Sequence, residues 1–261
     1  MLNRFIADSK KYYKYAVYSS KAELKSEIAN SHLSWLWWIL DPFLFMCVYS
    51  FIAVIVFDKG EKYFIAFVFI GLTCWDFFNK TVKQSVKLVS SNKQIVTKVY
   101  IPKFILIVIK MGVNGFKMVI SFTLVLVMML IYRVPLNWHM LLIIPIFLTL
   151  FLLTFGASAI LLHFGVFVED LSNVINVLLR LVFYLSGIFY SIVKNVNAPY
   201  NEILLLGNPM ALIINDMREA LLYNSSIHVV AIFAWFLVSL LFAITGLNLI
   251  YKYENSYVKV I

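Results

Sequence analysis

The segment from residue 79 to residue 117 constrains this chain more than any other, because it is strongly basic and lies between long apolar runs. It contains eight lysines, and no carboxylate occurs between Asp76 and Glu169. Short loops rich in Lys and Arg stay on the cytoplasmic side of a bilayer. We therefore predict that this segment is cytoplasmic and that it fixes the orientation of the apolar runs on either side of it.

The composition indicates an integral membrane protein. Hydrophobic residues make up 62% of the 261 residues and charged residues 13%, whereas soluble domains contain roughly 45–50% and about 25%. The formal net charge of +9 could suit a nucleic acid, but the basic residues cluster at the ends of apolar runs. An anionic membrane surface is therefore the predicted partner, and nucleic acid is not. The N-terminus has no apolar h-region, so no cleavable signal peptide is expected.

The apolar runs predict an all-α integral membrane protein with a single transmembrane domain over residues 1–261. Each run is close to the length that a membrane-spanning helix needs. Six spans are expected, at residues 33–57, 63–87, 104–132, 138–167, 171–193 and 227–251. An even number of spans places both termini on the same side of the membrane. With the basic segment 79–117 in the cytoplasm, that side is the cytoplasmic one.

Two further segments are too polar to span. Residues 4–31 predict an amphipathic helix, because Tyr13, Val17 and Leu24 share one stripe that lysines flank. Such a helix lies in the inner membrane interface, and a soluble cytoplasmic helix is the alternative. Residues 196–225 are interrupted by Pro199 and Pro209 and are predicted to form a re-entrant external segment before the last span.

Five short motifs resemble, in the right order, those of the ABC type-2 exporter permeases. They are NSHLSWLW from residue 30 with Asp41-Pro42, NKQIVTKVYIPK from residue 92, FVEDL from residue 167, LSGIFY from residue 185, and Asn208-Pro209 with Arg218. The similarity covers nearly the whole chain and is closest to the branch that exports polysaccharides, teichoic acids and O-antigens. The chain departs from these motifs at Ser34, Glu169 and Gly187, where the family has Gly, Arg and Pro.

This resemblance implies the membrane subunit of an ATP-driven exporter in the bacterial cytoplasmic membrane. Its substrate would be a lipid-linked cell-envelope glycan, such as teichoic acid or an O-antigen-like polysaccharide on an undecaprenyl-type lipid. A homodimer of the chain would work with two copies of a separate ABC ATPase, which would bind ATP and Mg. The chain itself has no G-x-x-x-x-G-K-[ST] phosphate loop and no cluster with metal-ligand spacing, so it is not expected to be an enzyme or to bind a cofactor or metal.

The resemblance also assigns roles to two segments. A coupling helix at residues 90–102 would contact the ATPase through Asn92, Lys93, Thr97, Lys98, Tyr100 and Pro102. The external segment at residues 196–225 would form a gate that includes Asn208, Pro209 and Arg218. Without the resemblance, the residues of the 90–102 segment would instead favour a solvated loop whose lysines only set the topology.

Three polar residues share one face of the third predicted span. Lys110, Asn114 and Lys117 follow at helical spacing, and a charge at membrane depth costs on the order of 2.5–3.5 kcal/mol unless it faces a cavity or a partner. We expect the lysines to receive the diphosphate of a lipid-linked substrate, with Asn114 donating a hydrogen bond. Snorkelling toward the inner headgroups is the alternative. Gly112 and Gly115, on another face, could permit close helix packing.

Arg180 and several aromatic residues are the remaining candidates. Arg180 lies nine residues into the fifth predicted span, where it would contact substrate phosphate or pair with Asp41 or Asp76. The family lines its channel with the first and fifth spans, and sugars stack on aromatic rings. The resemblance therefore makes channel candidates of Tyr49, Phe183, Tyr184, Phe189 and Tyr190.

Three rival functions remain open from the sequence. A permease of the same class could export a drug or a small lipid. An intramembrane enzyme acting on polyprenyl-phosphate sugars would need clustered catalytic carboxylates, and the carboxylates of this chain are scattered along the sequence. A passive channel or scaffold would need no ATPase partner.

Overall fold

The computed structural model describes residues 2–29, 34–52, 62–135 and 137–260, and these residues contain no β-strand. The longer helices are α1 (Leu2–Ile28), α2 (Ser34–Ile52), α3 (Phe64–Val86), α6 (Lys103–Ile131), α7 (Ile143–Phe167), α8 (Leu171–Leu185) and α12 (Val229–Val260). Shorter helical segments join them: α4 (Leu88–Ser91), α5 (Lys93–Val96), η2 (Trp138–Leu142), α9 (Ile192–Asn195), α10 (Tyr200–Gly207), α11 (Pro209–Arg218) and η3 (Glu219–Tyr223). The prediction of an all-α protein is confirmed.

Four helical segments of the described chain are long and apolar enough to cross a bilayer: α3, α6, η2 with α7, and α12. Helices α2 and α8 are apolar but shorter. The 15 residues of α8 reach roughly 22 Å, less than the ~30 Å hydrocarbon core. The count of six spans therefore stays a prediction.

The helix expected at residues 171–193 is shorter than its apolar run suggested. It ends at Leu185, and Gly187 follows with a φ of +62°. This left-handed conformation is cheap for glycine and breaks the helical path. The chain then turns back through α9 and α10 toward the bundle. Helices α3 and α6 begin and end within one residue of their expected ranges, whereas α12 continues to Val260 rather than ending at residue 251.

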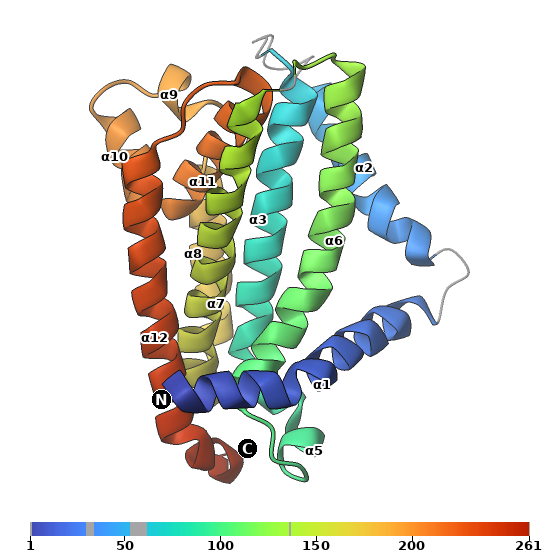
Figure 1. The fold of residues 1–261 in the computed structure, drawn as a ribbon, viewed down its shortest axis with the longest axis vertical. Coiled ribbons are helices and arrows are strands. Elements are labelled where there is room, and N and C mark those ends of the chain that lie inside the picture. The colour runs from blue at the N-terminus through green and yellow to red at the C-terminus, as the bar shows by residue number, and fades with distance from the viewer. Residues whose placement is uncertain (1, 30–33, 53–61, 136, 261) are drawn as a thin grey trace.

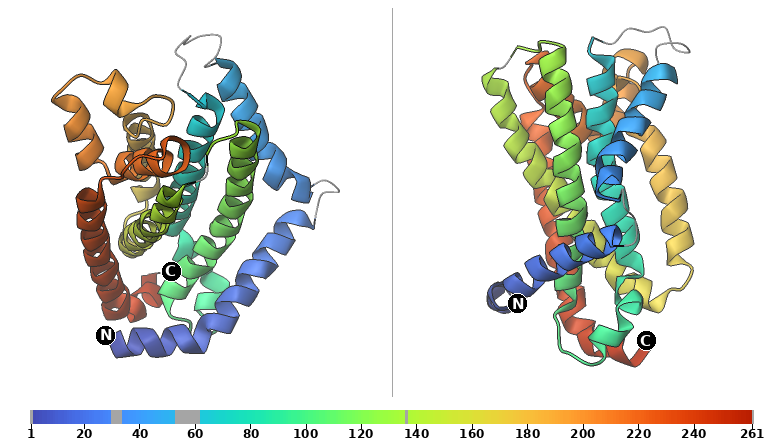
Figure 2. Two further views of the ribbon diagram at one scale, coloured as in Figure 1. Left: turned by 45° about the horizontal axis from the view of Figure 1, so that its top comes forward. Right: turned by 90° about the vertical axis from the view of Figure 1, so that its right-hand side faces the viewer.

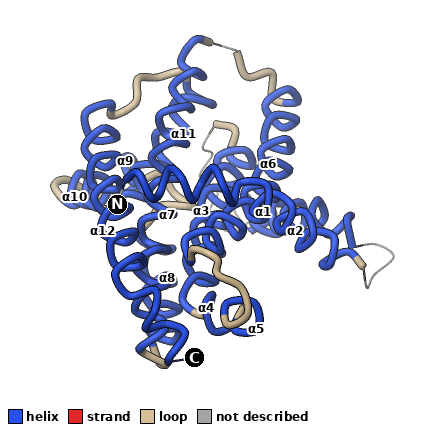
Figure 3. The backbone as a smooth tube through the Cα atoms, turned by 60° about the horizontal axis from the view of Figure 1, so that its bottom comes forward, coloured by secondary structure: helices blue, strands red, loops and turns tan. Residues whose placement is uncertain are grey.

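The long helices form an elongated bundle (Figure 1). Helices α3, α6, α7 and α12 run side by side along its length, while α1 lies across one end. Two further views place α2 beside α3 and α6 and place α8 on another side of the bundle (Figure 2). Both chain ends lie at the end with α4 and α5, and α9 to α11 lie at the opposite end (Figure 1). Figure 3 shows the described chain as helices joined by loops.

The core is centred on α3 and on the short helix α11. Residues 66–70 of α3 are buried, and so is α11 from Met210 to Arg218. The segment predicted as an external gate thus divides into the more exposed α10 and the enclosed α11.

Small residues bring two other helices close together: α7 packs on α12 where Gly156 faces Ala243 and Gly246 faces Ala159. Such residues allow backbones to approach in membrane helices.

Candidate functional site

The cations predicted to lie at membrane depth on α6 are paired with the N-terminal helix. Lys110 forms an ion pair with Glu23, and Lys117 forms one with Glu27 at 2.8 Å. The side chains of both lysines are less than one-third exposed. Neither of the two roles expected from the sequence, diphosphate binding or snorkelling, includes these carboxylate partners on α1.

The third residue of that face is a structural contact between two helices. Asn114 is buried, and its amide donates to Thr81 Oγ1 at 3.0 Å and to Gln84 Oε1 at 3.1 Å, both on α3. Gly112 does allow close packing, since an added Cβ would lie 2.7 Å from Ser20 Oγ. Its neighbour is therefore α1, not another long bundle helix.

The ion pairs on α1 lead to a prediction about charge reversal. Lys110→Glu should place two carboxylates together and loosen α1, whereas the double change Lys110→Glu with Glu23→Lys should restore the attraction with its sign inverted. We expect the melting temperature of the purified chain in detergent to fall in the single variant and to recover in the double variant. The measurement is thermal unfolding of both variants beside the wild type. A melting temperature that is lowered equally in both variants would show instead that a cation is needed at position 110 itself.

The segment expected as one coupling helix at residues 90–102 is broken into two single turns. Asn92 separates α4 from α5, and its amide donates to Leu88 O at 2.8 Å, which is an alternative to helix continuation. Thr97 Oγ1 bonds back to Lys93 O at 2.8 Å. Pro102 is buried and caps α6, whereas Lys93 and Lys98 are exposed. The segment is therefore two short helical turns instead of the single helix expected, and its lysines lie at the surface.

Tyr100 connects this segment to both ends of the chain. Its hydroxyl accepts from Arg4 Nη2 at 2.7 Å and donates to Glu254 Oε2 at 3.2 Å, and Arg4 also pairs with Glu254 at 2.5 Å. Tyr12 adds a bond to Tyr100 O at 3.2 Å. The hydrogen bond to Glu254 raises the pKa of Arg4, which keeps the guanidinium charged. We name Arg4, Tyr100 and Glu254 the terminal clasp; beside it is a cleft of about 220 Å³.

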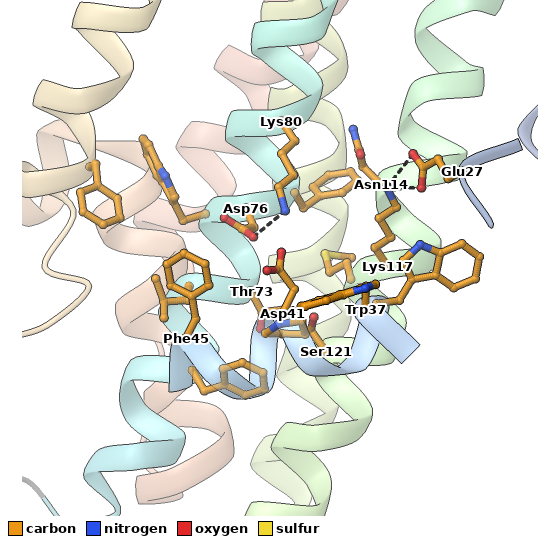
Figure 4. A pocket seen from close by; sticks show the side chains of 18 residues that line it. Glu27, Trp37, Asp41, Phe45, Thr73, Asp76, Lys80, Asn114, Lys117 and Ser121 are labelled. Carbon is orange, nitrogen blue, oxygen red and sulfur yellow. Dashed lines mark hydrogen bonds and ion pairs between the residues drawn. The ribbon is translucent and has the colours of Figure 1, made fainter. Parts of the chain in front are cut away.

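A larger cavity of about 430 Å³ lies between the end of α1 and helices α2, α3, α6 and α8 (Figure 4). We name it the aromatic cavity. Its walls are Glu27, Trp37, Trp38, Asp41, Pro42, Phe45, Phe69, Leu72, Thr73, Trp75, Asp76, Phe77, Lys80, Asn114, Lys117, Met118, Ser121 and Phe183. Three predicted site residues, Asn114, Lys117 and Phe183, are therefore brought together here. The volume is within the roughly 300–1,000 Å³ of ordinary ligand sites.

The carboxylates that are scattered in the sequence meet at this cavity. Glu27, Asp41 and Asp76 all line it, which corrects the expectation from their sequence separation. Asp76 pairs with Lys80 at 2.9 Å, and Glu27 is held by Lys117 (Figure 4). Two of the three carboxylates are therefore engaged by lysines.

The other predicted channel residues are distributed around α8. Phe183 packs on Trp75 with ring centroids 5.5 Å apart, and Phe189 packs on Phe183 at 5.6 Å. Tyr190 donates to Tyr184 O at 3.0 Å, and the Tyr184 residue is 70% exposed. The side chain of Tyr49 lies outside the described residues.

Arg180 is exposed on α8 and forms no ion pair with a carboxylate in the described ranges. The expected pairing with Asp76 is not formed, because Asp76 binds Lys80. Asp41 lines the aromatic cavity, and no described residue forms an ion pair with it either. The structural pairing expected for Arg180 is therefore absent from the described part of this single chain.

The residues assigned to the external gate form a hydrogen-bonded junction. Asn208 caps α11 by accepting from Met210 N at 3.0 Å, and its amide donates to Leu185 O at 3.2 Å. Pro209 follows in the first turn of α11, where its missing N–H costs nothing. Arg218 is buried and donates to three backbone carbonyls, those of Phe67, Gly187 and Ile188, at 2.7–2.9 Å.

Sequence reasoning misses one ion pair near this junction, between a buried carboxylate and an exposed histidine. Asp216 is fully buried and accepts from the backbone N–H of His228 at 2.9 Å and from its Nδ1 at 2.7 Å. The carboxylate thereby satisfies a donor at the beginning of α12. The sequence gives no signal for this pair, because the two residues are 12 positions apart across a turn.

These features are those of a multi-pass helical membrane protein, with one end joined by the terminal clasp and an aromatic cavity between its helices. No family model matches the chain. It is 28% identical to the O-antigen export system permease protein RfbA of Myxococcus xanthus over 77% of each chain. It is 22% and 24% identical to two proteins of the same name from Klebsiella pneumoniae over 92% of each chain. The resemblance to polysaccharide-exporting ABC type-2 permeases is therefore confirmed.

Proposed function

We propose that this chain is the membrane subunit of an exporter that moves a lipid-linked cell-envelope polysaccharide, O-antigen-like or teichoic acid, across the bacterial cytoplasmic membrane. The observation that carries the proposal is the similarity to O-antigen export permeases along 92% of both chains. A match over that length includes the bundle, the α4–α5 segment and the external junction. The chain acts as a transport subunit and has no ATPase site of its own.

The partners follow from this role. Two copies of an ABC ATPase, carrying ATP and Mg, dock at the cytoplasmic end, and a second copy of the chain completes the path. An exposed arginine within an apolar helix is costly against lipid. We therefore place Arg180 and Tyr184 of α8 on the glycan path between the two copies. Both termini are cytoplasmic in this arrangement.

The geometry suggests how a movement of the ATPase would be transmitted. Lys93, Thr97 and Lys98 lie shortly before Pro102 in the chain. A force that the ATPase applies to them is therefore transmitted to the start of α6. The terminal clasp passes the same movement to α1 and α12, because Tyr100 contacts both Arg4 and Glu254. The ion pairs of Lys110 and Lys117 then bind α1 back to α6. The end of the bundle therefore moves as one body.

Co-purification tests the proposal. The tagged chain from its native host should retain an ATPase with a phosphate-binding loop and should show ATP hydrolysis. Lys98→Glu with Tyr100→Ala should lower the retained ATPase by about tenfold, because charge and a ring are lost from the docking surface. Lys194→Glu is the matched control, since it makes the same charge change on α9 at the opposite end. A chain that purifies alone, without ATP hydrolysis, would refute the exporter function.

A further inference from the structure

The aromatic cavity has the wrong charge for the diphosphate of a lipid-linked substrate. Its walls carry three carboxylates, Glu27, Asp41 and Asp76, against two lysines. Both lysines are already neutralised, Lys80 by Asp76 and Lys117 by Glu27. A bound diphosphate would therefore face a net negative wall with no uncommitted lysine, and repulsion between like charges opposes its entry.

The same walls have the chemistry that suits an uncharged sugar. The C–H face of a pyranose ring is apolar and stacks on indole or phenyl rings, while its hydroxyl groups donate to carboxylates and accept from hydroxyls. Trp37 is half exposed at the wall, and Phe183 contributes a second ring. Asp41 offers a carboxylate that no described residue binds as an ion pair. Aromatic walls with a few placed polar groups are typical of specific small-ligand sites.

An unsatisfied hydroxyl gives independent support for a ligand. Thr73 lines the cavity and is only 4% exposed, and its Oγ1 has no hydrogen-bond partner in the described structure. Helical threonines elsewhere in the chain bond back to a carbonyl, as Thr81 and Thr154 do at 2.7 Å. A buried polar atom without a partner is costly, and of the buried unpaired side-chain atoms in the described residues, Thr73 Oγ1 is the one whose residue lines this cavity. Figure 4 shows Thr73 beside Asp41.

We propose that the aromatic cavity binds an uncharged sugar ring of the glycan, with Trp37 as the stacking platform and Asp41 and Thr73 as its hydrogen-bond partners. The diphosphate of the same substrate is bound elsewhere. This inference rests on the proposed export of a lipid-linked glycan and specifies which part of that substrate the cavity holds. The end of α1 contributes Glu27 to the wall.

The test is binding to the full chain in nanodiscs with two probes: a polyprenyl diphosphate that carries a short neutral glycan, and the same polyprenyl diphosphate without sugar. The double variant Asp41→Asn with Thr73→Val should bind the glycan-bearing probe about tenfold more weakly, since two hydrogen-bond partners are altered. Its affinity for the sugar-free probe should not change. Trp37→Leu should also weaken only the glycan-bearing probe.

Two variants serve as controls. Thr73→Ser retains the hydroxyl and should bind both probes like the wild type. Thr123→Val makes the same change as Thr73→Val at an exposed position of α6 outside the cavity, and it should have no effect. Thermal unfolding of each variant verifies that the bundle is intact.

Equal weakening for both probes in the double variant would overturn the proposal, because the cavity would then bind the lipid headgroup or act only through structure. Unchanged binding of the glycan-bearing probe would overturn it as well. The proposed function fails in a different way: cells that lack the chain would still export their glycan. Export that depends on the chain, without discrimination between the probes, would refute only the role of the cavity.

Discussion

Arg218→Ala is expected to destabilise the folded chain strongly, because it removes the donor from three buried carbonyls, those of Phe67, Gly187 and Ile188. The carbonyl of Phe67 keeps its hydrogen bond within α3, but those of Gly187 and Ile188 lie outside any helix and would be left unpaired. Each such carbonyl costs about 1–3 kcal/mol, so the loss in unfolding free energy should be at least about 2 kcal/mol. The guanidinium also lies 3.4 Å from the ring centroid of Phe67, and this contact is lost too.

The measurement is thermal unfolding in detergent, together with the amount of protein found in the membrane fraction. Arg218→Lys should recover little, because an ammonium cannot reproduce the planar fork that reaches three carbonyls. Arg133→Lys, at an exposed position, is the matched control and should leave the melting temperature unchanged. If Arg218→Lys were as stable as the wild type, the carbonyl contacts would not be what holds α3, α11 and the turn after α8 together.

Gly165→Ala is expected to separate α7 from α3. An added Cβ at Gly165 would lie 2.0 Å from Val86 O and 2.8 Å from Val86 C, both backbone atoms of α3. Neither can rotate away as a side chain would, so the helices must move apart. Overpacking of this kind costs typically about 1–3 kcal/mol and occasionally more.

A second glycine provides the control for this prediction. The nearest atom to a Cβ at Gly115 would be Phe77 Cε2 at 3.8 Å, which is ordinary contact. Gly115→Ala should therefore leave the melting temperature the same or raise it slightly, because alanine favours the helix. Equal melting temperatures for the two variants would show that α7 and α3 do not approach as closely as the backbone contact at Val86 indicates.

Much of the architecture follows from local properties of the sequence. Apolar runs of sufficient length predict α3, α6, α7 and α12, since burial in a bilayer depends on composition along one segment. Two segments differ from the helices expected, for local reasons that a hydropathy pattern does not show. Helix α8 ends early because Gly187 adopts a positive φ, and the coupling segment is broken at Asn92 because its side chain competes for a backbone carbonyl.

The identity of the site residues is partly accessible from the sequence, but their partners are not. The spacing of Lys110, Asn114 and Lys117 correctly places three polar groups on one face of α6. It does not predict Glu23 or Glu27, although two glutamates one helical turn apart on an amphipathic helix are a readable signal for a basic partner. Likewise, the family resemblance assigns Arg218 to a gate, whereas its side chain is committed to backbone carbonyls.

Composition, helix length and motif order are properties of single segments, and they suffice to identify a helical membrane protein and the exporter permeases that it resembles. Which charges meet is instead a property of the folded chain. Lys110 and Glu23 are 87 positions apart, and Arg218 and the carbonyl of Phe67 are 151 positions apart. Such contacts depend on how each helix is rotated and how deeply it lies, which close packing sets and local pattern does not.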